Sequence, residues 1–517
     1  MAMLSMGHGV LHGAVPFVDT FEQRGPYMYF LMALTYVISP KAALFGLALL
    51  ESVNLGLVYL VFFKTARLFY RRLNSQIIAL IGILVLLLGG SFHYGGSPEE
   101  FVILPVVYIF YLLFKSTVND NWDWSRGQLI LSGIAFGYIF WLKYILIGYI
   151  FSPLLMIFIY QLIKKHFKKA FLMVFWALIG FFLASVPVFV YYLLTSGISG
   201  LSSLWDGYFI INLRYSHFNV NPLIAYFVLP LMAFLRLFIG YYSITLSLLL
   251  ISIYFLFDKH YQTRHSRLIL IFSLVLALII NFAPGRAGLS YLLVFCSVMI
   301  ELAICACGNF WYNMSTLFKT HHYGIVFCFA VIFALILIPF NRSSFNTVYN
   351  FSSLKYTYGY ASDSTKERSP YLIGQRIKRD PGSLMVYGEL DQGYFYWSNQ
   401  TPKFYEWEST VYSYSHNGQA LNMQYEMLAK KSSKYVVMYD AMGQRKTFSH
   451  RDFRYVYHKK QYLTKWIEYP GLGKLKYHLA KTLLRNYRIV GRYVYRVPKN
   501  TSLNGSKYEV SLLWQRK

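Results

Sequence analysis

Apolar runs close to one membrane thickness recur along the chain between residues 43 and 340, with short polar loops between them. A crossing helix needs about 20 apolar residues to span a bilayer core of about 30 Å. The runs predict ten spans, at residues 43–63, 77–91, 101–115, 127–142, 144–163, 171–194, 237–257, 268–282, 288–306 and 323–340. The pattern therefore predicts an α-helical polytopic membrane protein.

Two further apolar runs do not fit a simple crossing. Residues 27–38 form a run of only 12 residues, which predicts a helix along the outer surface. Residues 222–236 carry Pro222, Pro230 and Arg236, which favours an interfacial or re-entrant helix.

The chain after residue 340 is polar and aromatic, which predicts a separate mixed α/β domain over residues 341–517. Its strand-like runs are Ser383–Tyr387, Tyr394–Trp397, Lys434–Tyr439, Arg488–Arg496 and Tyr508–Trp514. Its helix-like stretches lie near Gln419–Lys430 and Leu475–Leu484. The predicted organisation is a first loop with a surface helix at 1–42, a helical membrane domain at 43–340, and this domain.

Charge fixes the expected orientation. The chain is 56% hydrophobic. Most Lys and Arg between the spans lie in every second loop, and the positive-inside rule places these loops in the cytoplasm. The first loop and the C-terminal domain are then outside the cell, in a multi-pass protein of the cell membrane. This topology makes the first 40 residues or so cross without a preceding helix, so we expect a first transmembrane helix to be missing from the start of the chain.

The net charge of +27 is uneven. Residues 342–517 hold 29 Lys and Arg against 12 Asp and Glu, or +17. A basic domain beside a bilayer is expected to bind anionic membrane lipids or an anionic cell-envelope polymer. A nucleic-acid partner is not expected, because no nucleic-acid motif accompanies the charge.

The first loop holds the most informative candidates for chemistry. Asp19 and Glu22 are two of only ten acidic residues before residue 342, and they lie between Pro16 and Gly25–Pro26. A carboxylate at the membrane boundary can take a proton from a hydroxyl nucleophile or hold a divalent cation. The alternative is a solvated loop acid or a helix cap. Arg24 is either a phosphate ligand or the partner of Asp19.

Other outward charges form a second group of candidates. Glu99 and Glu100 follow Ser97–Pro98, so they are either the first turn of a helix or a second acidic site. Lys143 lies at the expected turn of a hairpin, where it either binds a lipid phosphate or only extends to the interface. Arg286 lies on a Gly-rich turn between two spans and is a similar candidate. Glu51 and Glu301 lie within spans, Glu51 as a candidate partner for an outer cation and Glu301 without an assigned role.

No Walker motif, HExxH or Cys/His zinc spacing is present in the sequence. These findings argue against an ATP-driven pump and a zinc protease. They fit an enzyme whose activated substrate is already in the membrane.

The sequence resembles the GT-C membrane glycosyltransferases, and is similar to bacterial glycosyltransferase family 39 (protein mannosyltransferase-like) proteins. The resemblance rests on LHGAVPFVDTFEQRGPYMYFLMAL at residues 11–34, and more loosely on GGSPEEFVILPVVYIFYLLF, GIAFGYIFWLKY and PGRAGLSYLL. It implies sugar transfer from a polyprenyl-phosphate donor to a cell-envelope acceptor, a polymer or a glycan, at the outer face.

The resemblance also implies roles for individual residues. Asp19 falls on the position of the catalytic acid, and Lys143 or Arg286 would hold the donor phosphate. Three departures are the missing first helix, Val18 where an arginine is common, and Ser290 in place of a histidine before Tyr291. No cofactor is assigned, and a divalent cation at Asp19 stays open. The alternatives are a flippase or exporter of a lipid-linked saccharide, and a polysaccharide polymerase or ligase.

Overall fold

The computed structural model describes residues 1–88, 96–212, 252–253, 263–282, 291–320, 368–387, 390–408, 414–443, 481–496 and 508–517. The chain divides into two compact units. We call Leu44–Val190 with Ser216–Tyr358 the helical unit, and Met1–Ala43, Tyr191–Tyr215 and Gly359–Lys517 the loop-and-sheet unit.

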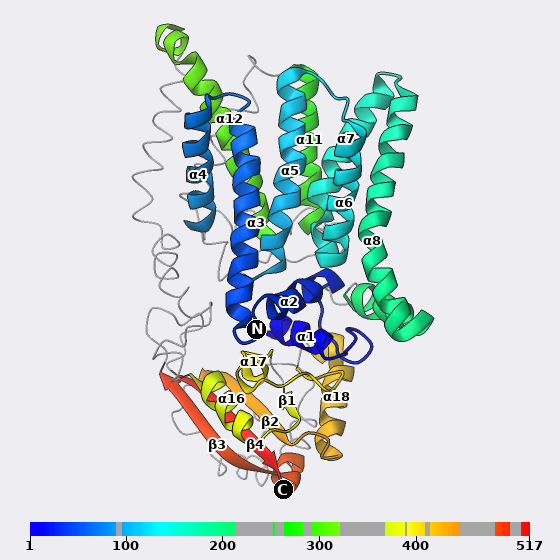
Figure 1. Cartoon of the computed structure of the whole chain (residues 1–517), viewed down its shortest axis with the longest axis vertical. Coiled ribbons are helices and arrows are strands. Elements are labelled where there is room, and N and C mark those ends of the chain that lie inside the picture. Colours follow the sequence, from blue (N-terminus) through cyan, green and yellow to red (C-terminus); the bar gives the residue numbers. More distant parts are fainter. Residues whose placement is uncertain are drawn as a thin grey trace. The chain divides into compact units, whose positions relative to one another are not determined.

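The described part of the helical unit consists of helices (Figure 1). They are α3 (Ala43–Ala66), α4 (Arg72–Leu88), α5 (Pro98–Asn119), α6 (Arg126–Lys143), the 3₁₀ turn η1 (Tyr144–Ile147), α7 (Gly148–Ile163), α8 (Phe167–Leu204, which continues into the next unit), α11 (Arg264–Phe282) and α12 (Tyr291–Thr320). Each matches an expected span, so the polytopic helical class is confirmed. The expected spans at 237–257 (apart from residues 252–253) and 323–340, and the segment 222–236, lie outside the described residues.

Four stretches in the described chain are long and apolar enough to cross a membrane: Ala43–Ala66, Pro98–Asn119, Arg126–Ile163 and Phe167–Ile210. The third stretch is broken at Lys143, whose φ of −163° and ψ of 82° are not helical. This break separates α6 from α7, as the length of the run predicted.

Small residues let α6 and α8 approach closely. A Cβ atom added to Gly133 of α6 would lie 1.9 Å from the carbonyl oxygen of Ala177, and one added to Gly180 of α8 would lie 2.0 Å from that of Ile130. Backbone contact of this kind is typical of small-xxx-small motifs in membrane helices, and Gly133 and Gly137 have that spacing. The opposite side of α8 exposes large apolar side chains, which suits lipid: Phe171, Phe175, Leu178, Phe182 and Val186.

The loop-and-sheet unit combines two N-terminal helices with a four-stranded sheet (Figure 1). Its elements are α1 (Ala2–Leu11), α2 (Pro26–Ile38), the π-helix η2 (Trp205–Ile210), α16 (Ser369–Arg379), β1 (Leu384–Val386), α17 (Tyr394–Ser398), α18 (Tyr414–Ala429), β2 (Tyr435–Gly443), β3 (Tyr487–Arg496) and β4 (Tyr508–Arg516). The helix α1 was not expected from the sequence. It packs against α2, where Gly7 lies so close to Met32 that a Cβ would meet its atoms at 2.5–2.6 Å.

The sheet has the strand order β1-β2-β4-β3, with β1 parallel to β2 and the other pairs antiparallel. One face carries the domain core, which is formed by the buried side chains of Met385, Leu428, Val436, Met438, Leu483, Tyr487, Leu512 and Trp514. Four of the five expected strands are present, and α18 matches an expected helix. Residues 481–486 are helical, and the earlier part of the expected helix at 475–484 lies outside the described residues.

The expectation of a strand at Tyr394–Trp397 was wrong, because these residues form α17. The Asp391 carboxylate accepts hydrogen bonds from the backbone N–H groups of Gly393 and Tyr394, at 3.0 and 2.8 Å. Gly393 has a φ of 113°, which glycine adopts readily. This capped turn directs the backbone into a helix although the aromatic composition favours a strand.

Candidate functional site

The first loop, residues 14–24, folds into a tight turn around Asp19. The Asp19 N–H donates to the carbonyl oxygen of Val15 at 2.8 Å, and the Val15 N–H donates to Asp19 Oδ2 at 2.8 Å. Phe17 has a φ of +64°, a conformation that is uncommon for a bulky residue. The Phe17 ring is buried against Phe21 and Tyr208, which holds this turn in place. Asp19 itself is exposed, so its carboxylate is fixed by the backbone and open to solvent.

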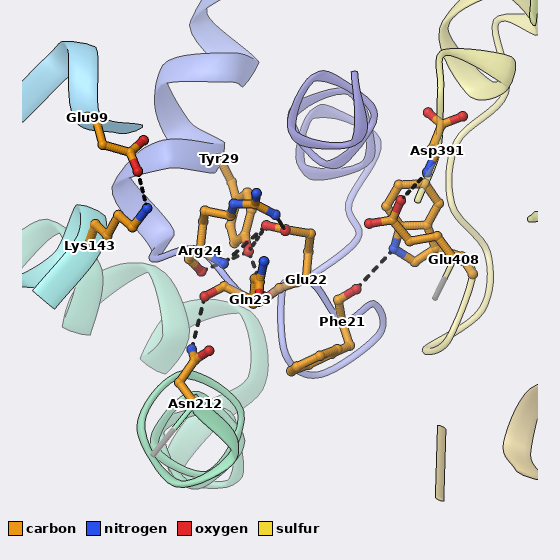
Figure 2. Close-up of polar contacts among 11 residues, drawn as sticks. Phe21, Glu22, Gln23, Arg24, Tyr29, Glu99, Lys143, Asn212, Asp391 and Glu408 are labelled. Carbon is orange, nitrogen blue, oxygen red and sulfur yellow. Dashed lines mark hydrogen bonds and ion pairs between the residues drawn. The ribbon is translucent and has the colours of Figure 1, made fainter. Parts of the chain in front are cut away.

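The C-terminal part of α8 and η2 hold the same loop from another direction. The Tyr192 hydroxyl donates to the carbonyl oxygen of Pro16 at 3.2 Å. The Asn212 side-chain amide donates to the carbonyl oxygen of Gln23 at 2.9 Å (Figure 2). A Cβ atom on Gly207 would lie 2.5 Å from the Phe17 ring, so η2 approaches the loop through a glycine. Both ends of the loop are therefore tied to residues 192–212, which form two helices with a break at Gly197.

Glu22 is completely buried and forms an ion pair with the Arg24 guanidinium (Figure 2). Its Oε2 atom also accepts a hydrogen bond from the Arg24 N–H at 3.1 Å and lies 2.9 Å from the Tyr29 hydroxyl. Arg24 keeps 23% of its side chain exposed. Glu22 is thus suited to fixing Arg24, whereas Asp19 and Arg24 are the members of this loop that can reach a ligand.

A second cluster lies in the helical unit and joins three residues that sequence reasoning had singled out separately. Glu99 in the first turn of α5 forms an ion pair with Lys143, the last residue of α6 (Figure 2). The Lys143 ammonium lies 4.4 Å from the ring centroid of Tyr291, the first residue of α12, which is a cation–π contact. The Lys143 side chain is 18% exposed and that of Glu99 only 3%. Glu99 and Tyr291 therefore hold the Lys143 ammonium in one orientation.

Glu100 has a different environment from its neighbour. It is fully buried, and its Oε2 accepts a hydrogen bond from the Gly96 N–H at 2.8 Å. The side-chain amide of Asn54 donates to the Glu100 carbonyl oxygen at 3.0 Å, and a Glu51 carboxylate oxygen lies beside Gly96. Ser97 caps α5 by accepting from the Glu100 N–H, so Glu100 contributes to the start of the helix. Arg286 lies outside the described residues.

Sequence reasoning gave no role to a buried acidic group in the C-terminal domain. The Asp391 carboxylate accepts from the Ser5 hydroxyl at 2.9 Å, and the Asp391 N–H donates to Glu408 Oε2 at 2.6 Å. Burial raises the pKa of Asp391 and of Glu408, and it raises the pKa of Glu406 to about 8. The sequence could have indicated this group, because Asp391, Glu406 and Glu408 are three acids within 18 residues of an otherwise basic domain.

Within the described ranges, no three His, Cys, Asp or Glu side chains form a group that could hold a metal ion.

No protein-family model matches the chain, and no curated protein sequence matches it. Among solved structures, it is similar to ArnT from Cupriavidus metallidurans in the apo state, with a TM-score of 0.52 and 12% identity over 99% of this chain and 92% of that one. The same protein bound to undecaprenyl phosphate gives a TM-score of 0.50 at the same identity and coverage. An oligosaccharyltransferase from Archaeoglobus fulgidus gives a TM-score of 0.44 at 12% identity, over 96% of this chain and 69% of that one. The chain thus shares its overall fold with ArnT.

Proposed function

We propose that this protein transfers a sugar from a polyprenyl-phosphate donor to a cell-envelope acceptor at the outer face of the membrane. The observation that carries the proposal is the exposed Asp19 carboxylate, held by the Val15 N–H in the first loop of a chain that shares its overall fold with ArnT. The ArnT structure bound to undecaprenyl phosphate supports a donor of this lipid class.

In the proposed reaction, Asp19 acts as the general base. Val15 binds Oδ2, so Oδ1 is the oxygen that we assign to the acceptor hydroxyl. Oδ1 takes the hydroxyl proton as the acceptor oxygen bonds to the anomeric carbon of the sugar. The bond from that carbon to the phosphate oxygen breaks in the same step, and its electron pair leaves with the polyprenyl phosphate. Glu22 takes part through Arg24, which it orients.

Lys143 is the proposed ligand of the donor phosphate. The Lys143 ammonium has three N–H donors. The ion pair with Glu99 and the contact with the Tyr291 ring orient the ammonium, so its remaining N–H donors point in a defined direction. Positive charge at the leaving phosphate stabilises the transition state, in which negative charge develops there. Arg24 and Arg286 are assigned to the same role, as further cations, while Glu99, Glu100 and Tyr291 support the outer ends of their helices.

The acceptor is proposed to be an anionic polymer or glycan of the cell envelope, bound with the help of the basic C-terminal domain. Its described surface exposes many cations: Arg376, Lys378, Arg379, Lys430, Lys431, Arg485, Arg488, Arg492, Arg516 and Lys517. Charge of this density attracts phosphate- or carboxylate-bearing chains and also membrane lipids.

The proposal is tested with membranes that contain the protein and a radiolabelled polyprenyl-phosphate hexose. Wild type is expected to transfer label to envelope material, and Asp19→Asn is expected not to. The Asn side chain retains an oxygen acceptor for the Val15 N–H, so the turn should persist. Asp123→Asn is the matched control, because Asp123 is another loop acid, 52% exposed, which pairs with Lys169. Label carried across the membrane without transfer would instead indicate a flippase and overturn the proposal.

A further inference from the structure

The edge of the C-terminal sheet is extended by a short segment, residues 405–407. The strand β1 is the first in the sheet order, and the Val386 N–H on it donates to the carbonyl oxygen of Trp407 at 2.9 Å. The buried Gln424 amide donates to the carbonyl oxygens of Val386 and Glu406, at 3.1 and 3.0 Å. These hydrogen bonds fix the segment to the sheet.

The same segment binds the first loop at Phe21. The Phe21 N–H donates to the carbonyl oxygen of Tyr405 at 2.8 Å. The Trp407 indole N–H donates to the Phe21 carbonyl oxygen at 3.2 Å. The rings of Phe21 and Tyr405 stack with centroids 5.7 Å apart. Both backbone hydrogen-bonding groups of Phe21 are therefore taken by residues of the C-terminal domain.

The Trp407 indole has little freedom to move. It is fully buried. The Phe395 ring of α17 packs against it in a T-shaped arrangement, with ring centroids 4.8 Å apart and ring planes at 88°. Phe21 is two residues from Asp19 and adjacent to Glu22. A shift at Phe21 is thus transmitted directly to the carboxylate that we assign as the base, and catalysis is sensitive to displacements of about 1 Å.

We propose that Trp407 is a positioning residue for the first loop, so that the C-terminal domain completes the catalytic site and does more than attract the acceptor. This inference rests on the proposed function for its effect on catalysis, whereas the hold on the loop can be measured without activity. Trp407 contacts the loop and not the reacting atoms, so it orients Asp19 through Phe21.

The test compares Trp407→Phe with Trp514→Phe in the full chain. Phe at 407 keeps an aromatic ring against Phe395, and it removes the N–H donor together with part of the indole volume. Trp514→Phe removes the same volume. Trp514 is an equally buried tryptophan in the core of the same sheet, beside Val436 and Leu512, so its replacement controls for general weakening of the domain. Hydrogen exchange is followed in a peptide that covers residues 15–25 and in one from β2.

Trp407→Phe is expected to speed exchange in the loop peptide by roughly fivefold, the factor that loss of one hydrogen bond gives, with β2 exchange unchanged. The kcat for transfer, expressed per molecule of folded protein, should fall by roughly tenfold while KM for the donor stays constant. Loss of folded protein alone would leave the kcat per folded molecule unchanged. Three outcomes would overturn the inference. The loop peptide of Trp407→Phe could exchange at the wild-type rate, or Trp514→Phe could speed exchange of that peptide equally. The third is an unchanged kcat in Trp407→Phe although its loop exchanges faster. If wild type itself transfers no sugar, the proposed function fails, and the exchange data still decide whether Trp407 holds the loop.

Discussion

Lys143 at the end of α6 forms an ion pair with Glu99 in the first turn of α5, and so links two helices at one end of their antiparallel pair. Glu99 is nearly buried, so its charge is stable there only beside a cation. The pair has two separable roles in our account. It stabilises the helix ends, and it presents the ammonium to the donor phosphate.

These roles predict different behaviour for single and double variants. Lys143→Met leaves the Glu99 carboxylate without its cation, and we expect the free energy of unfolding to fall by about 3 kcal/mol. Lys143→Met combined with Glu99→Gln removes both charges, so most of the thermal stability should return. The KM for the donor should stay raised in both. Recovery of a wild-type donor KM in the double variant would show that Lys143 does not bind the phosphate.

The close packing of α6 on α8 predicts that a Gly→Ala substitution in α6 lowers the free energy of unfolding only at positions that face α8. Gly133→Ala would place its Cβ against the Ala177 carbonyl, and we expect a loss of roughly 1–3 kcal/mol in the free energy of unfolding, from overpacking. Gly127→Ala in the same helix is the control, because its Cβ would meet no atom within 4 Å. It should change stability by less than about 1 kcal/mol. Thermal unfolding of the detergent-solubilised protein measures both, and equal midpoints for the two variants would contradict the packing.

The buried Glu406 predicts a pH dependence of stability. Its pKa is raised from 4.5 to about 8 by burial, so between these values the folded state binds more protons than the unfolded state. The free energy of unfolding should therefore fall as pH rises from about 4.5 to 8, by at most about 1.4 kcal/mol per pH unit from this group, and change little from it above pH 8. The raised pKa values of Asp391 and Glu408 act in the same direction.

Glu406→Gln provides the corresponding measurement. Its carbonyl contact with Gln424 uses the backbone and is retained. Thermal unfolding followed between pH 5 and pH 9 should show a shallower decline in this variant than in wild type. An identical pH dependence in the two proteins would mean that Glu406 ionises as freely when folded as when unfolded.

The helices of the helical unit were predictable because each apolar run must satisfy its backbone groups internally, and the break at Lys143 followed from the length of its run. The strands β1, β2, β3 and β4 were visible in their aromatic and β-branched composition. The helix α17 was not, because the capping carboxylate of Asp391 and the positive φ of Gly393 outweigh the preference of its aromatic residues for a strand.

Candidate residues could be named from the sequence, but their partners could not. Lys143, Glu99 and Tyr291 come together only through the packing of the neighbouring helices α5 and α6 with α12, which is distant from them in sequence. Glu301, which had no assigned role, accepts a hydrogen bond from the Thr65 hydroxyl at 2.6 Å. The contact between Phe21 and Trp407 spans 386 residues, and no local pattern indicates it.

The central claim is that Asp19 is the base for sugar transfer, and single-turnover kinetics test it most directly. Purified wild type and Asp19→Asn would be saturated with a polyprenyl-phosphate hexose and mixed with acceptor, and the rate of transfer and the donor affinity would be measured. We predict that the rate falls by at least about 100-fold, the contribution of a positioned general base, with the donor affinity unchanged. Transfer by Asp19→Asn at the wild-type rate would contradict the account.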